Sequence, residues 1–74
     1  MKLAERIRNI REAKKMTQAE VAYFINISPS AYGQIERKAG STRLDTLYKI
    51  AKALSVKITF LIDLENPDYF EKTS

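Results

Sequence analysis

Cysteine, histidine and tryptophan are absent from this 74-residue sequence, and glycine and proline occur only twice each. Without cysteine no disulfide can stabilise the fold, and the absence fits a reducing compartment. A zinc site would need carboxylates alone, which zinc sites rarely use. The side chains that most often act as nucleophile and general base are also missing. We therefore expect no metal, no cofactor and no enzymatic activity.

Long apolar runs are missing as well. No stretch approaches the length of a membrane-spanning helix. Residues 1–15 are basic and lack the apolar segment of a signal peptide. These features predict a soluble, cytoplasmic protein with no membrane partner. A chain of this length allows one small domain, whose core is marginal without a staple or a partner.

The positive charge is concentrated in one part of the chain. Residues 1–57 hold 12 Lys and Arg against 5 Asp and Glu, whereas residues 58–74 hold 1 against 4. A basic body attracts phosphates over about a Debye length. Charge alone favours an ordinary solvated surface, so an interpretation as a nucleic-acid-binding protein depends on the motifs.

Apolar residues recur at helical spacing through most of the chain and predict helices over 2–15, 18–25, 29–37 and 43–54. Thr17 with Glu20, and Thr42 with Asp45, have the spacing of capping boxes. Ser28 before Pro29 is a typical helix start. The helices at 18–25 and 29–37 are therefore joined by a short, well-capped turn, which is the layout of a helix-turn-helix.

Residues 56–64 allow two structures. Val56, Ile58 and Phe60 begin an alternation of apolar and mostly polar residues that continues to Leu64, and this slightly favours a strand. Ile58, Leu61 and Ile62 would also suit a short fifth helix. The segment 65–74 is polar, acidic and interrupted by proline, and we expect it to form a tail.

The predicted helix 29–37 has a second, polar face. Ser30, Gly33 and Gln34 share it, and a helix whose outward side chains are short can enter the DNA major groove. A glycine inside a helix costs about 0.5–1 kcal/mol relative to alanine, and close approach to a partner is one reason to tolerate that cost. The alternative is that this face is simply solvated and that Gly33 has no functional role.

The stretch "MTQAEVAYFINISPSAYGQIERKAGSTRLDTLYKIAKALSV" resembles the lambda-repressor-like, Cro/C1-type helix-turn-helix family. The matching features are Thr17-Gln18, Ala22, the Ile-Glu-Arg triplet 35–37 and the helix beginning "LDTLYKIAKAL". The resemblance covers about residues 3–62. It implies an all-α bundle of four to five short helices over 1–64. It also implies a homodimer that binds a palindromic operator in double-stranded DNA and regulates transcription, most often as a repressor.

The resemblance also implies roles for individual residues. Bases would be read by Ser28, Pro29, Ser30, Gly33 and Gln34. The DNA backbone would be contacted by Gln18, Arg37, Lys38, Ser41 and Arg43. Arg11 and Glu36 match a charged pair that ties the first helix to the third. Glycines usual in the family are replaced here by Asn26, Lys38 and Ser55, which puts the cap at Lys38 and the path of the loop after it in question.

Two further expectations come from the residues themselves. The spacing of Tyr32 to Ile35 places Tyr32 in the core, with a phenol oxygen that can still reach the surface and bind a phosphate. The apolar set in 56–64 predicts a dimer interface made of Val56, Ile58, Phe60, Ile62 and Leu64.

Two other functions compete with transcriptional regulation. One is the DNA-binding antitoxin of a toxin–antitoxin pair, which would add a toxin protein as partner. The other is a protein-interaction module on the same scaffold, which would show no salt-dependent DNA binding.

Overall fold

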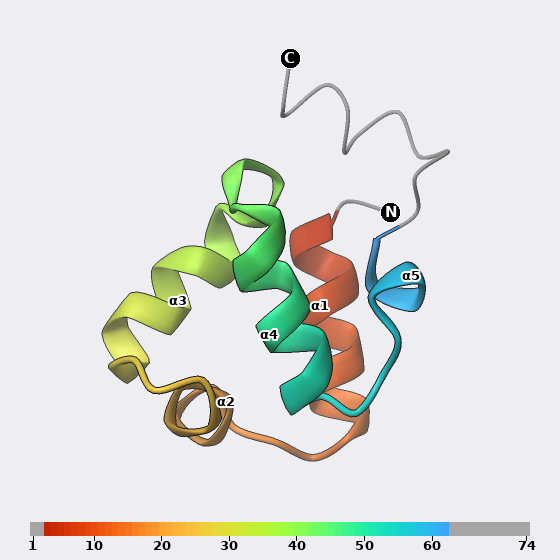
Figure 1. The fold of residues 1–74 in the computed structure, drawn as a ribbon. Coiled ribbons are helices and arrows are strands. Elements are labelled where there is room, and N and C mark those ends of the chain that lie inside the picture. Colours follow the sequence, from red (N-terminus) through yellow and green to blue (C-terminus); the bar gives the residue numbers. More distant parts are fainter. Residues whose placement is uncertain (1–2, 63–74) are drawn as a thin grey trace.

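The computed structural model describes residues 3–62, and the regular secondary structure in that range is all helical, which confirms the all-α class (Figure 1). Within it no helix is long and apolar enough to cross a membrane. Leu64 and the predicted tail 65–74 lie outside the described residues. The elements are α1 (Leu3–Ala13), α2 (Gln18–Phe24), α3 (Pro29–Arg37), the 3₁₀ turn η1 (Ala39–Ser41), α4 (Leu44–Ala53) and α5 (Ile58–Leu61).

Side-chain caps fix the starts of α2 and α3. The Thr17 hydroxyl accepts from the Glu20 backbone N–H at 3.0 Å, and the Glu20 carboxylate accepts from the Thr17 N–H at 2.7 Å, so the predicted capping box forms. Ser28 accepts from the Ala31 N–H at 3.1 Å, and Pro29 occupies the first helical position. The turn between the two helices is therefore defined on both sides.

Three helices end in the left-handed conformation without glycine. Lys15, Asn26 and Ser55 have φ values of 58°, 69° and 59°. In each case the next N–H reaches back to a carbonyl in the last helical turn, as Val56 does to Ala51 at 3.0 Å. Asn tolerates this conformation better than other residues. The substitutions at 26 and 55 therefore keep the backbone path that glycine would allow.

The core lies between α1, α4 and the α2–α3 pair. Its fully buried members include Ile7 from α1, Val21 from α2, Tyr32 from α3, and Leu47 and Ile50 from α4. In Figure 1, α4 crosses in front of α1, and α5 lies beside α1 on the side away from α3. This arrangement leaves the outer face of α3 uncovered within residues 3–62.

The preference for a strand over 56–64 is wrong in the described part, because residues 58–61 form α5. Alternation would have put Phe60 inside and Leu61 outside. Instead Leu61 and Ile62 are buried, while Phe60 is 61% exposed. A helical turn places Ile58, Leu61 and Ile62 on one side, at i, i+3 and i+4. Packing against α4 and α1 thus outweighs the β-branched composition.

The predicted capping box of Thr42 and Asp45 is also wrong. The N-cap of α4 is Arg43, and it makes no side-chain cap bond. The Thr42 hydroxyl instead donates to the Lys38 carbonyl at 3.2 Å, because the chain leaves α3 through η1. Lys38 has φ −116°, so the left-handed cap that glycine provides in the family is replaced by this 3₁₀ turn.

Candidate nucleic-acid interface

The exposed face of α3 carries the side chains that were predicted to read bases. Ser28, Pro29, Ser30 and Gln34 are all exposed, and they come from the start and the middle of the helix. On the opposite side Tyr32 and Glu36 are buried, and Ile35 is partly buried. Contacts with α2 orient the helix, through Val21 and Ala22, both fully buried. The buried side of α3 therefore anchors the helix and leaves the face with Ser30 and Gln34 exposed. We call this face the polar strip of α3.

Gly33 differs from the rest of the predicted base-reading set, because it is buried rather than exposed. A Cβ built on it would lie 3.6 Å from Gln18 Oε1 and 3.7 Å from Arg37 Nη1. These are ordinary van der Waals distances. The Gln18 and Arg37 side chains thus cover Gly33, and the Gly33 backbone is not part of the exposed polar strip.

Glu36 is the centre of a buried polar network. Its side chain is 1% exposed and accepts from Arg11 at two oxygens, with Nε to Oε2 at 2.9 Å and Nη2 to Oε1 at 3.2 Å. Arg11 Nη1 also donates to the Met16 carbonyl at 2.9 Å. The guanidinium therefore connects α1, the α1–α2 loop and α3 through fork-like hydrogen bonds of the stronger, charge-assisted kind.

The surroundings of Glu36 determine its ionisation. Burial alone would raise the pKa of this carboxyl group, but the Arg11 guanidinium, helped by the Tyr32 hydroxyl and the Gln18 amide, holds the pKa below its usual value. Burial, followed by the interaction with the Glu36 carboxylate, raises the pKa of the Tyr32 phenol. Tyr32 is fully buried, and its hydroxyl makes no hydrogen bond of standard geometry within residues 3–62. The expectation that this hydroxyl reaches the surface is therefore wrong.

Gln18 belongs to the same network. It is the first residue of α2 and is exposed, yet its Nε2 donates to Glu36 Oε1 at 3.2 Å. The residue predicted to touch a phosphate is thus joined to the buried ion pair. The sequence contained no signal for this link, because the two residues are 18 positions apart and their contact depends on how α2 crosses α3.

Cations and small polar groups follow the end of α3. Arg37, Lys38, Ser41 and Arg43 are all exposed around η1 and the start of α4. Arg43 Nε lies 3.4 Å from Asp45 Oδ1, and both side chains are largely exposed. The predicted backbone-contact residues therefore surround one end of α3, with Gln18 beside its middle.

The predicted dimer-interface residues are divided by the fold. Ile62 is buried inside the monomer and is not available to a partner. Val56 and Ile58 are partly buried, and Phe60 is exposed between two shallow hollows. One hollow is lined by Val56, Lys57 and Thr59, the other by Arg6, Asn9 and Ile10.

Sequence reasoning missed two arginines of α1. Arg8 Nε lies 3.8 Å from Glu36 Oε1, and Arg6 Nη1 donates to the Phe60 carbonyl at 3.5 Å, which ties α1 to α5. The position of Arg8, three residues before Arg11, was the available signal.

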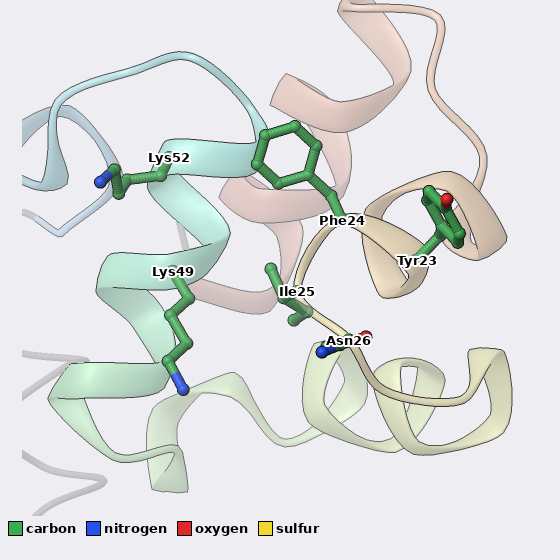
Figure 2. A pocket seen from close by; sticks show the side chains of 6 residues that line it. All are labelled: Tyr23, Phe24, Ile25, Asn26, Lys49 and Lys52. Atoms are coloured by element: carbon green, nitrogen blue, oxygen red, sulfur yellow. The ribbon is translucent and has the colours of Figure 1, made fainter.

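A further hollow lies between the end of α2 and α4, with Tyr23 and Phe24 on one side and Lys49 and Lys52 on the other (Figure 2). It shares no residue with the predicted DNA contacts.

Comparison with known proteins places this geometry in a family. The model of the helix-turn-helix family matches residues 7–61, which span all of α2, α3, α4 and α5. The chain belongs to the lambda-repressor-like, Cro/C1-type helix-turn-helix family, and the resemblance noted from the sequence is confirmed.

Several curated proteins are similar to this chain. It is 41% identical over 58 residues to the cryptic phage CTXphi transcriptional repressor RstR of Vibrio cholerae, covering 78% of this chain and 52% of that protein. It is 34% identical over 65 residues to the immunity repressor protein of Bacillus phage phi105, covering 88% and 45%. It is 32% identical over 65 residues to the uncharacterized HTH-type transcriptional regulator YobD of Bacillus subtilis, covering 86% and 58%.

The chain thus spans about half the length of the curated relatives it matches. No solved structure matches significantly.

Proposed function

We propose that this protein is a sequence-specific, double-stranded DNA-binding regulator of transcription that acts as a repressor. The observation that carries the proposal is the outward polar strip of α3, held in place by the capped turn and the buried contacts with α2. A helix held in this way matches the recognition helix of helix-turn-helix proteins, whose leading residues meet base edges in the major groove. Two of the similar proteins are named as repressors, and this supports repression rather than activation.

Gln34 and Ser30 carry base recognition in this proposal. Both are exposed and lie four positions apart on one face of α3. The Gln34 amide offers a donor and an acceptor together, which suits the N6 and N7 edge of adenine. Ser28 and Pro29 stand at the entry of the helix, where the serine hydroxyl is already used as a cap and proline offers only apolar contact.

Phosphates are contacted around the C-terminal end of the recognition helix and beside its middle. Arg37, Lys38, Ser41 and Arg43 provide cations and a hydroxyl around that end, and Gln18 provides an amide beside Gly33 and Glu36. Contacts of this kind fix the register of the protein on DNA and carry no sequence information directly. They also make binding dependent on salt.

The protein acts as a homodimer joined through the surface around Phe60. That side chain is 61% exposed, and the hollows beside it are lined by the apolar parts of Val56 and Ile10. In a two-fold arrangement the Phe60 side chain of each copy can enter a hollow of the other. One helix-turn-helix reads only a few base pairs, so two copies about 34–36 Å apart along the DNA would supply specificity.

Fluorescence anisotropy with labelled duplex DNA at several salt concentrations tests the proposal. We expect binding whose logarithmic affinity falls linearly with the logarithm of salt concentration. A protein-interaction module would show no such binding, and that result would refute the proposed function.

A further inference from the structure

We propose that Glu36 is a positioning residue for DNA binding, because it holds the side-chain amide of Gln18 in the orientation that leaves one amide N–H for a DNA phosphate. The inference rests on the proposed function. It goes beyond the structural role of Glu36 as the partner of Arg11, and it makes the buried ion pair part of the binding surface.

The chemistry of the pair fixes which way the amide faces. Gln18 Nε2 lies 3.2 Å from Glu36 Oε1. An ionised carboxylate can only accept hydrogen bonds, so the nitrogen of the amide, and not its oxygen, must face Glu36. The hydrogen bonds that Glu36 receives keep its pKa low, so the carboxylate is charged at neutral pH. The amide orientation is therefore set by a group that is itself fixed and 1% exposed.

The opposite side of the amide is also defined. Gln18 Oε1 lies above Gly33, 3.6 Å from the position that a Cβ there would take, and Arg37 Nη1 lies 3.7 Å from the same position. These are van der Waals distances, so the amide packs over Gly33, and a side chain larger than a methyl group at this position would displace it. Gln18 is thus held between a carboxylate and a glycine while remaining exposed.

This arrangement leaves one donor for DNA. A glutamine amide has two N–H groups, and Glu36 accepts from one of them. Because the side chain is already ordered, binding a phosphate costs less rotamer entropy than it would for a free surface glutamine.

Replacing Glu36 should change DNA affinity in the direction opposite to that expected from its charge alone. Removing a negative charge near DNA should strengthen binding, whereas removing the group that orients Gln18 should weaken it. We expect Gln18→Ala to reduce affinity about tenfold, as for one hydrogen bond to a charged group. Glu36→Gln should weaken binding severalfold in the wild-type background and cause no further loss in the Gln18→Ala background.

A double-mutant cycle of Glu36→Gln and Gln18→Ala measures the coupling between the two residues in DNA binding. Affinities are determined by anisotropy on one labelled duplex that the wild-type protein binds, at a temperature where circular dichroism shows all variants folded. Ile50→Val is the control, because it lowers stability in the core of α4 without touching the network, and it should leave affinity unchanged. The salt slope should stay the same in every variant, since none loses a cation.

A second readout needs no DNA. The side-chain amide resonances of Gln18 in an ¹⁵N NMR spectrum should move toward those of a solvated glutamine when Glu36 is replaced by Gln. If that variant does not fold, Glu36→Asp keeps the charge, withdraws the carboxylate by one methylene and should move the same resonances. Equal affinity losses in both backgrounds, or unmoved Gln18 resonances, would overturn the proposal. Absence of DNA binding by the wild type would overturn the proposed function along with it.

Discussion

Arg11 and Glu36 are 25 positions apart in the chain, yet two nitrogens of the guanidinium donate to the two oxygens of the carboxylate, at 2.9 and 3.2 Å. Arg11 shares its face of α1 with Leu3 and Ile7, which are buried hydrophobic residues. The charged pair therefore lies within the apolar packing between α1 and α3. In a domain without disulfides, such a pair determines how these two helices are joined.

Removing the carboxylate should destabilise the fold strongly. Glu36→Ala leaves Arg11 buried without its partner, and the free energy of unfolding should fall by about 3–5 kcal/mol. Urea unfolding at pH 7 measures this. Asp45→Ala is the control, because its pair with Arg43 is 60% and 85% exposed and should contribute less than about 1 kcal/mol. Equally small losses in both variants would show that Glu36 is simply solvated.

Stability should also fall in acid. The pKa of Glu36 is lower in the folded protein than its ordinary value of 4.5. Its contribution is therefore complete above the pKa of the unfolded state and is lost as the pH falls through the lower folded pKa. Urea unfolding between pH 7 and pH 3 should show this loss below about pH 4.5. Glu36→Gln should show a smaller loss, and an identical pH dependence in both proteins would contradict the assignment.

Gly33 should accept a methyl group. The built Cβ has only ordinary contacts, and no glycine within residues 3–62 has positive φ. Gly33→Ala should therefore raise the free energy of unfolding by up to about 1 kcal/mol, because alanine favours a helix. Gly33→Leu should leave the protein folded but push Gln18 and Arg37 aside, so that DNA binding weakens. Unfolding curves and anisotropy on both variants test this, and full DNA affinity in Gly33→Leu would refute it.

Phe60 should determine the oligomeric state. Phe60→Ser removes the largest exposed apolar group of α5 and should convert the dimer to a monomer in sedimentation at micromolar concentration. Tyr23→Ser is the matched control, because Tyr23 is 86% exposed on α2 and outside the proposed interface. A monomeric wild type, or a dimer unaffected by Phe60→Ser, would refute the interface.

Lys38 should contribute charge and no sequence preference. Lys38→Ala should weaken binding to all DNA sequences alike and reduce the slope of log affinity against log salt by about one. Anisotropy on two unrelated duplexes across a salt series checks both points. A changed preference between the duplexes with an unchanged slope would contradict the assignment.

Sequence reasoning located the helices because their signals are local. Thr17, Ser28 and Pro29 fix the starts of α2 and α3, and those starts were predicted correctly. Segment 56–62 was less predictable, because the same residues satisfy a period of two and a period of 3.6. Only packing of Leu61 and Ile62 against the rest of the core decides between them.

The polar network was predictable only in part. The pairing of Arg11 with Glu36 was implied by family resemblance, whereas the link from Glu36 to Gln18 depends on how α2 crosses α3. The burial of Gly33 follows from the same crossing, since neighbouring side chains cover it. Such contacts join residues far apart in the chain and have no pattern in the sequence.

Selection of bound sequences from a pool of random duplex DNA, carried out with the wild type and with Gln34→Ala, tests the central claim most directly. We predict that the wild type enriches a two-fold symmetric site whose half-site centres are about 34–36 Å apart. Gln34→Ala should lose preference at one base pair in each half-site, at a cost of about 1–3 kcal/mol. No enrichment by the wild type, or the same site with undiminished preference at every position for Gln34→Ala, would contradict the account.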